Sequence, residues 1–295
     1  MIYEIRQVST YRYAATVPFA RCTLRLLPRD DPGQRVFTSG LDIAPASTQR
    51  SRRTDFFGNH VTSLTVETPH RELKITARSR VEVDREAPPH GALTPRWEQT
   101  RRDSVQAPSL APTAPAHFLF PSRYTPLIDE ITEYTRQSFA PGRPVLEGAA
   151  ELMGRIRADF KYDPKATDIS TPLREVFARR GGVCQDFAHL MIAGLRGLGL
   201  PAAYVSGYIR TIPPPGTKRL EGADASHAWV SVWCGAEFGW RDLDPTNNLH
   251  VGNDHIMLAV GRDYADVSPI DGVIVGSGGQ KLTVSVDVLP INGPV

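Results

Sequence analysis

Apolar and polar residues alternate with a period of two over the first part of the chain. From residue 2 to about residue 83 the apolar positions form short runs, and the clearest run has steps of two or four residues: Leu73, Ile75, Ala77, Val81 and Val83. Such spacing is typical of a strand with one buried face. Turn-forming residues at 28–33 and 57–59 separate the runs. We therefore predict an antiparallel β-rich domain over residues 1–86, built as a small sandwich or sheet.

Prolines are dense between residues 87 and 122, where they occupy positions 88, 89, 95, 108, 112, 115 and 121. Proline lacks a backbone N–H and fixes its φ angle, so this density argues against regular helix. We predict a connector over residues 87–122. Its large apolar side chains can pack on either neighbouring domain and would then make the connector a clamp: Trp97, Phe118, Leu119 and Phe120.

After residue 122 the apolar positions change to the spacing of helices. Thr-Pro pairs at 125–126 and 171–172 are typical helix starts, because proline is favoured at the first helical position. Residues 145–160 carry an apolar stripe at helical spacing. We expect the helix after residue 172 to stop at 181–182, where two glycines can adopt the left-handed conformation.

A further helix is predicted to begin at or near Cys184 and to end at Gly199. Its apolar residues follow at steps of four, four and three: Phe187, Met191, Leu195 and Leu198. Strand-like segments come next, at 203–209, 227–233, 240–244, 256–260 and 282–289. Helices followed by an antiparallel sheet indicate an α+β fold, and we assign residues 123–295 to this second domain.

Composition and charge exclude several classes of protein. The chain has 295 residues and a formal net charge of +2, which favours two soluble domains and gives no sign of a nucleic-acid or membrane partner. The N-terminal sequence MIYEIRQVSTYRY lacks a secretion signal, and no run of about 18 apolar residues follows. A cytoplasmic location is therefore expected. The sequence carries no signal of oligomeric state.

Three cysteines, Cys22, Cys184 and Cys234, lack C-x-x-C spacing. An odd number of cysteines at such positions fits neither a disulfide framework nor a structural zinc site, so free thiols are expected. Cys22 and Cys234 are interpreted as structural thiols.

Cys184 stands where a nucleophile could be activated, in the segment GGVCQDFAHL. The N-terminus of a helix stabilises a thiolate, and the glycines before it let a substrate approach the backbone closely. The Cys184 N–H would then be an oxyanion donor. The alternative is a small buried cysteine after a glycine cap, and this segment alone does not decide between the two.

A histidine and a carboxylate follow in two predicted strands. In ASHAWVSVW, strand alternation places His227 on the same face as Trp229 and Trp233, whereas the alternative is a buried histidine without catalytic function. In GWRDLDPTN, Asp242 and Asp244 share one face, and either could orient His227. Parity does not choose between the two aspartates, and the one not used is expected to have a turn or capping role.

These three segments, in this order, resemble the transglutaminase-like superfamily, specifically its bacterial branch with a β-rich N-terminal domain before a papain-like core. The resemblance covers essentially the whole chain. It implies that Cys184 is the nucleophile, His227 the general base and acid, and Asp244 the orienting carboxylate, because the family's aspartate lies in a D-P-T context. The family's second oxyanion donor has no match that we can assign.

The resemblance implies an acyl-transfer enzyme that needs no cofactor and no metal and acts on a peptide or protein substrate. Hydrolysis of amide, peptide or isopeptide bonds through a thioester on Cys184 is favoured. Protein-glutamine transamidation shares every step up to the thioester and is the first alternative. The second is a non-catalytic module that binds peptides, although such a module would not need an intact Cys-His-Asp set.

Other residues with possible chemistry have simpler interpretations. His189 is expected to pack inside the fold, and Asp186 to stabilise the helix dipole. His250 and His255, with Asp254, lack the spacing of a metal site and are interpreted as part of a polar loop. The segment 210–226 is interpreted as a connection between strands; as a cleft wall, its Lys218 and Arg219 would attract acidic peptides.

Overall fold

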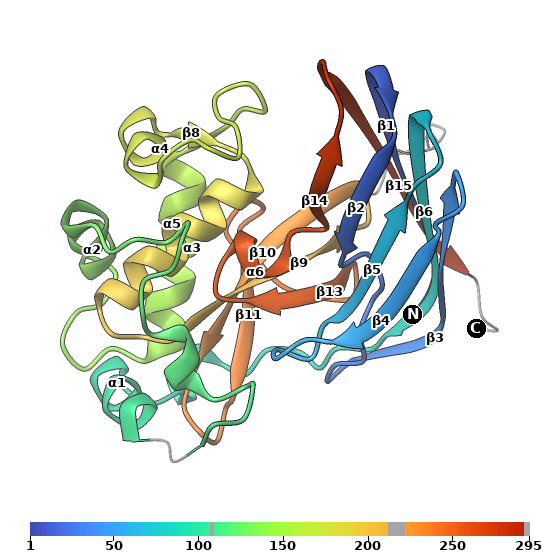
Figure 1. The fold of residues 1–295 in the computed structure, drawn as a ribbon. Helices are drawn as coiled ribbons and strands as arrows, with labels where there is room; N and C mark the ends of the chain where they lie inside the picture. Colours follow the sequence, from blue (N-terminus) through green and yellow to red (C-terminus); the bar gives the residue numbers. More distant parts are fainter. Residues whose placement is uncertain (107–108, 212–221, 223, 292–295) are drawn as a thin grey trace, which may run out of the picture.

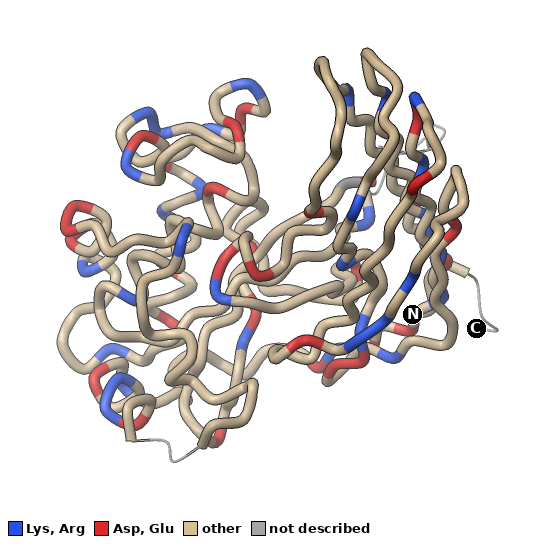
Figure 2. The backbone as a smooth tube through the Cα atoms, viewed as in Figure 1, with Lys and Arg blue, Asp and Glu red and all other residues tan. Residues whose placement is uncertain are grey.

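The computed structural model describes residues 1–106, 109–211, 222 and 224–291, and it has three parts (Figure 1). A β-sandwich lies on one side, helices lie on the other, and a five-stranded antiparallel sheet lies between them. The fold is α+β, as the sequence predicted. Basic and acidic residues are interspersed over the described chain (Figure 2). Among the described residues, no helix has the length and apolar character needed to cross a membrane.

Two four-stranded antiparallel sheets form the sandwich, with strand orders β15-β1-β6-β3 and β14-β2-β5-β4. The N-terminal strands are β1 (Ile2–Val17), β2 (Phe19–Leu24), β3 (Gln34–Ala44), β4 (Gln49–Thr54), β5 (His60–Val66) and β6 (His70–Val83). Leu73, Ile75 and Ala77 of β6 are buried in the sandwich core, together with Leu24 and Leu64. The period-two pattern at the start of the chain therefore marks strands with one buried face, as predicted.

The last two strands return to the sandwich that the first strands begin. Strand β14 (Ile270–Val275) pairs with β2, and β15 (Gln280–Ile291) pairs with β1, both antiparallel. The predicted assignment of all residues from 123 to 295 to the second domain therefore differs from the structure at this end. Alternation identified 282–289 as a strand, but it carries no information about which strand is its partner.

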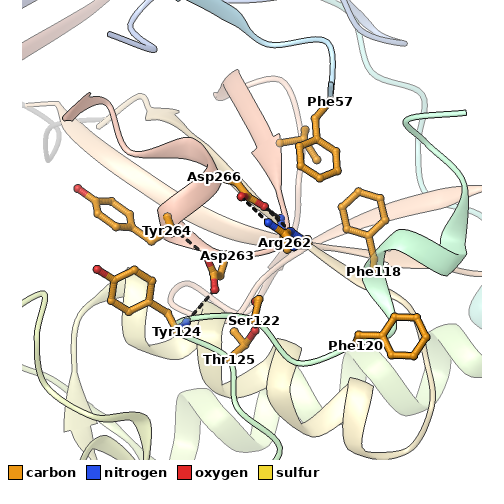
Figure 3. A network of polar contacts seen from close by, with 12 residues as sticks. Phe57, Phe118, Phe120, Ser122, Tyr124, Thr125, Arg262, Asp263, Tyr264 and Asp266 are labelled. Carbon is orange, nitrogen blue, oxygen red and sulfur yellow. Dashed lines mark hydrogen bonds and ion pairs between the residues drawn. The ribbon is translucent and has the colours of Figure 1, made fainter. Parts of the chain in front are cut away.

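The connector contains a helix that the sequence analysis excluded. Helix α1 (Trp97–Gln106) lies between the short 3-10 helices η1 (Gly91–Leu93) and η2 (Pro115–Phe118). Its ten residues contain no proline, since positions 95 and 108 flank them, so the local proline density was a poor guide. The connector does clamp the two domains. The centroid of the Phe118 ring lies 5.5 Å from that of Phe57 of the sandwich (Figure 3). It lies 5.1 Å from the centroid of Trp240 of the central sheet.

The central sheet has the strand order β12-β11-β10-β9-β13. Its strands are β9 (Ala202–Ile209), β10 (Ala225–Trp233), β11 (Trp240–Asp244), β12 (Leu249–His250) and β13 (His255–Gly261). The helices that cover one face are α2 (Asp129–Arg136), α3 (Val145–Asp159), α4 (Leu173–Arg179) and α5 (Cys184–Gly197), with α6 (Tyr264–Val267) after β13. Helix α5 is almost wholly buried between the sheet and the other helices, which agrees with its predicted apolar stripe.

Two helix ends differ from the sequence prediction. Helix α2 begins at Asp129 and not at the Thr-Pro pair, because the Thr125 hydroxyl is hydrogen-bonded to the Ser122 hydroxyl and to Arg196. Helix α4 ends with Arg180, and not a glycine, in the left-handed conformation, at φ 53°. The two glycines after it form the short strand β8 (Gly181–Gly182), parallel to β7 (Lys161–Tyr162).

Polar and apolar contacts fix the sandwich on the other face of the central sheet. Tyr3 and Ile5 of the sandwich share a buried cluster with Tyr208 of β9. The side-chain amide of Gln34 donates to the Met257 carbonyl at 2.9 Å and accepts from the Met257 N–H at 2.8 Å. The sandwich therefore covers the side of the sheet that the helices leave free.

We predict that replacing Gly207 by alanine destabilises the protein by about 3 kcal/mol, because overpacking a filled interior forces backbone and side chains apart. A Cβ at Gly207 would lie 2.2 Å from the Ile256 carbonyl oxygen and 2.4 Å from the Trp229 ring. Urea unfolding measures the change. Gly40→Ala in β3 is the matched control, since nothing lies within 4 Å of its Cβ. Equal stability of the two variants would contradict the prediction.

Candidate active site

The start of helix α5 presents the Cys184 thiol at the surface of an otherwise buried helix. Cys184 is partly exposed, and the Asp186 carboxylate accepts the Val183 N–H at 2.8 Å and the Thr167 hydroxyl at 2.6 Å. Asp186 thus caps the N-terminus of α5 through its hydrogen bond from Val183, in addition to the interaction with the helix dipole that the sequence suggested. Gly182 must be a glycine here, because a Cβ would lie 2.5 Å from the Asp186 carboxylate. The free N–H groups of this helix turn stabilise negative charge on the sulfur.

His227 of β10 lies between Cys184 and Asp244. Its Nε2 is 2.7 Å from Oδ2 of Asp244, and Cys184 lies close enough for its negative charge to act on the same ring. Because Nε2 is occupied by the carboxylate, Nδ1 is the nitrogen left for the sulfur. The structure therefore brings together the three residues that the resemblance selected.

Asp244, at the end of β11, is completely buried and accepts five hydrogen bonds. Oδ2 accepts from His227, from Nδ2 of Asn247 at 2.7 Å and from Nε2 of His255 at 3.2 Å. Oδ1 accepts the backbone N–H groups of Thr246 at 2.9 Å and Asn247 at 3.2 Å. Burial alone would raise the pKa of Asp244, but the bonds from His227 and His255 outweigh it and hold the pKa well below its usual range.

The imidazole of His227 is stabilised in its charged form. Burial opposes this charge, but the hydrogen bond to Asp244 and the interactions with the negative charges of Asp244 and Cys184 outweigh burial and raise the pKa of His227 to about 10. His227 is therefore protonated at neutral pH. An imidazolium beside the sulfur is the arrangement that favours a thiolate–imidazolium pair.

The structure distinguishes the two aspartates that strand parity left open. Asp242 does not approach His227; its carboxylate accepts the Trp229 indole N–H at 3.1 Å. The turn or capping role predicted for the unused aspartate is therefore wrong, because Asp242 fixes a side chain on the neighbouring strand. Trp229 is fully buried, with its ring centroid 6.3 Å from that of His227, so it shields this side of the imidazole from water.

Two further residues near this site were not predicted from the sequence, His255 and Tyr162. His255 does not lie in a polar loop: it is buried in β13 and hydrogen-bonded to Asp244. Tyr162 of β7 is half-exposed, and burial and the negative charge of Cys184 raise its pKa. Parallel pairing of Tyr162 with Gly182 brings it beside the start of α5. No local pattern reveals either contact, since both depend on pairing of distant strands.

The remaining candidates lie apart from Cys184 or are buried. His189 is buried, its Nε2 accepts the Tyr264 N–H at 3.2 Å, and its ring stacks on Tyr124, so its packing role is confirmed. Cys22 and Cys234 are free and buried, and burial raises their pKa values to about 11 and about 12. These two cysteines are therefore poor nucleophiles near neutral pH.

Asp254 is hydrogen-bonded to the Tyr3 hydroxyl and to Arg210, and within the described residues neither it nor His250 joins a cluster of metal-ligating groups. The suggested cleft wall with Lys218 and Arg219 falls largely on residues outside those that the structure describes.

A cavity of about 580 Å³ lies between the sandwich and the central sheet, lined partly by Phe57, Trp240 and Asp242. Neither Cys184 nor His227 lines it. Its size alone would make it a candidate site, but the nucleophile Cys184 and its partner His227 lie outside it. We therefore place the candidate active site at the start of α5.

Two protein families match the chain. The bacterial transglutaminase-like N-terminal region matches residues 3–82, and the transglutaminase-like superfamily matches residues 132–245, which include Cys184, His227 and Asp244. An uncharacterized protein of Mycobacterium tuberculosis is 42% identical over 301 residues, covering 99% of this chain and 93% of its own length. The chain belongs to the transglutaminase-like superfamily. The resemblance inferred from the three sequence segments is thereby confirmed.

One solved structure resembles the chain in fold, and a further protein resembles part of it in sequence. A crystal structure of a proposed cysteine protease from Cytophaga hutchinsonii superposes with a TM-score of 0.75 at 21% identity, covering 99% of this chain and 92% of its own. This likeness supports the fold. A Pseudomonas aeruginosa protein named protein-glutamine gamma-glutamyltransferase is 28% identical over 151 residues, which are 51% of this chain and 22% of that protein. Together the family and the site indicate an enzyme with cysteine-based chemistry.

Proposed function

We propose that the protein hydrolyses amide, peptide or isopeptide bonds through a thioester on Cys184. The observation that carries this proposal is the position of His227, whose imidazole is hydrogen-bonded to Asp244 and lies close enough to Cys184 to interact with its charge. A nucleophile, a proton carrier and an orienting carboxylate in this order are what acyl transfer requires. Peptide or protein is the substrate class, and nucleic acid and membrane are not expected partners.

In the first half of the reaction, Cys184 Sγ attacks the substrate carbonyl carbon. The negative charge moves to the carbonyl oxygen, where the Cys184 N–H at the start of α5 is a suitable donor. His227 then transfers its Nδ1 proton to the leaving amine nitrogen as the C–N bond breaks, and a thioester remains on Cys184. Asp244 holds the imidazole in the tautomer and orientation that this transfer needs.

In the second half, water attacks the thioester carbon while His227 Nδ1 accepts a proton from it. The C–S bond breaks, the acid product leaves, and the thiolate–imidazolium pair is restored. An amine in place of water would give transamidation with the same residues. The likeness to the Pseudomonas aeruginosa glutamyltransferase favours that second candidate. Product analysis with and without added primary amine distinguishes the two, because only transamidation incorporates the amine.

A non-catalytic peptide-binding module is the third candidate. Such a module would gain nothing from a buried carboxylate and an imidazolium held beside a thiol, and burying charged groups is unfavourable unless they are paired. Reactivity of the thiol therefore separates this candidate from the enzymes.

A cytoplasmic location, expected from the N-terminal sequence, remains a prediction.

We expect iodoacetamide to alkylate Cys184 of the native protein at least about tenfold faster at pH 6 than it alkylates a free thiol. At this pH a free thiol with a pKa of about 8.5 is almost wholly protonated, whereas a thiolate–imidazolium pair is already reactive. Peptide mass spectrometry across pH measures the rate at each cysteine. Cys22 and Cys234, both buried, are internal controls and should stay unmodified.

The same experiment on His227→Ala decides whether the thiol is activated by its partner. If Cys184 of this variant is no longer alkylated faster than a free thiol at pH 6, the result supports a nucleophile paired with His227. A Cys184 rate that equals that of a free thiol, or that does not change in the variant, would refute the pairing and favour the peptide-binding module.

A further inference from the structure

A second histidine lies against the carboxylate of Asp244. His255, on β13, is separated from His227, on β10, by strand β9, and the two rings have centroids 6.0 Å apart. Both Nε2 atoms are within hydrogen-bond distance of the same oxygen, Oδ2 of Asp244, at 2.7 Å for His227 and 3.2 Å for His255. In the proposed reaction only the His227 imidazole carries a proton, and His255 enters only as a hydrogen-bond partner of Asp244.

The surroundings of His255 do not explain a histidine at this position by packing alone. The side chain is 3% exposed, and no described residue gives its buried Nδ1 a hydrogen-bond partner. A buried polar atom without a partner is unfavourable, so a purely structural position would favour an apolar residue. The one polar contact that the His255 side chain makes within the described chain directs its Nε2 at Oδ2 of Asp244.

The three groups have the chemistry and the spacing of a metal site. The ligand atoms of His227, Asp244 and His255 all lie within 4.8 Å of one another. Around a tetrahedral zinc ion with bonds of about 2.0–2.2 Å, neighbouring ligand atoms lie about 3.3 Å apart, so small shifts of the side chains would suffice. Two imidazoles and one carboxylate are ligands that zinc prefers.

Asn247 shows where an ion would reach this site. Its side-chain amide nitrogen lies 2.7 Å from Oδ2 of Asp244 and 3.4 Å from Nε2 of His227, while the residue itself is exposed. Rotation of the amide by a half turn would direct its oxygen at the same point. Asn247 thus lies at the fourth position of the site, where either this oxygen or a water molecule in its place can complete the coordination.

We propose that His227, Asp244 and His255 bind a transition-metal dication, with zinc the best match, and that the bound ion inhibits the enzyme reversibly. The ion takes the place of the proton that His227 Nε2 shares with Asp244, and this proton leaves to solvent. His227 then holds only its Nδ1 proton. Transfer of that proton to a leaving amine would leave an imidazolate, so the proton cycle stops until the ion dissociates.

Binding and inhibition are tested separately, because only the inhibition rests on the proposed function. Calorimetric titration of Zn²⁺ into Cys184→Ala protein, which keeps all three ligands and lacks the thiol, should show one ion bound with micromolar or tighter affinity. Adding His255→Gln to this background should weaken binding at least about tenfold, since glutamine keeps a donor for Asp244 and removes one metal ligand. His250→Gln, a half-buried histidine outside the cluster, is the matched control and should change nothing.

No binding to Cys184→Ala protein, or equal binding with and without His255→Gln, would overturn the metal site. Imidazole ¹⁵N spectra of Cys184→Ala protein give a readout that does not depend on the His255 variant: zinc should shift the Nε2 signals of His227 and His255, and unshifted signals would also overturn it. In active protein, zinc should slow alkylation of Cys184 and hydrolysis together. Zinc that binds as expected to a protein without any turnover would count against the proposed hydrolysis and leave the metal site standing.

Discussion

Replacing Asp244 by asparagine is expected to lower kcat about 10³–10⁴-fold and to leave the fold intact. Asparagine has the shape of aspartate but lacks the charge, so His227 loses the partner that fixes its tautomer and stabilises its imidazolium form. Hydrolysis of the best peptide amide from a substrate screen measures the loss. Asp242→Asn is the matched control. Asp242 lies on the same strand face as Asp244, but its carboxylate accepts the Trp229 indole N–H and is not hydrogen-bonded to His227.

The pH dependence of Cys184 alkylation should change in the same variant. In the native protein the pKa of His227 is raised to about 10, so the imidazolium beside Cys184 persists until the pH approaches that value. Without the carboxylate, the pKa of His227 falls toward its ordinary value of about 6.5, and above it the thiol has no imidazolium beside it. Alkylation should then rise with a midpoint near that of a free thiol. A profile that matches the native one would show that Asp244 does not act through His227.

Replacing Arg196 by methionine is expected to lower the free energy of unfolding by about 4 kcal/mol. Arg196 of α5 is 2% exposed and donates to backbone carbonyls of three segments, namely residues 118–120, Ala202 and Arg262. Methionine fills similar space but leaves these carbonyls unpaired inside the protein, and breaking such a buried charged network costs several kcal/mol. Burial lowers the pKa of Arg196 to about 10, so the charge is present at neutral pH.

Urea unfolding measures this loss, with Arg262→Met as the matched control. Arg262 forms an exposed ion pair with Asp266, four residues on, and such pairs contribute at most about 1 kcal/mol (Figure 3). Arg196 donates to the backbone carbonyl of Arg262 and not to its side chain, so Arg262→Met keeps the buried hydrogen bonds of Arg196. Similar stability of the two variants would show that the network contributes little.

The sequence predicted those features that local periodicity determines. The alternation in β6 and the stripe of α5 report burial on one face, and both are as predicted. The start of α5 at Cys184 followed from the same stripe. These predictions needed only the spacing of neighbouring residues, which reflects the geometry of a strand or a helix directly.

Contacts between distant segments were predictable only through the family resemblance, or not at all. The choice of Asp244 over Asp242 came from the D-P-T context and not from strand parity. His255 was missed because its contact with Asp244 depends on the position of β13 two strands away from β10. The network around Arg196 was missed for a similar reason, since its acceptors are carbonyls on segments far apart in sequence.

The return of β15 to β1 matters for how this chain folds while it is made on the ribosome. Strand β1 is paired with β15 from Ile2 to Tyr13, so this edge of the sandwich stays open until residues 280–291 have emerged. By then Cys184, His227 and Asp244 have long left the exit tunnel. A nascent chain, or one cut short before residue 280, would thus carry the full set of reactive groups beside a strand that is paired with β6 on one side and open from Ile2 to Tyr13 on the other, the kind of edge on which chaperones and other chains pair.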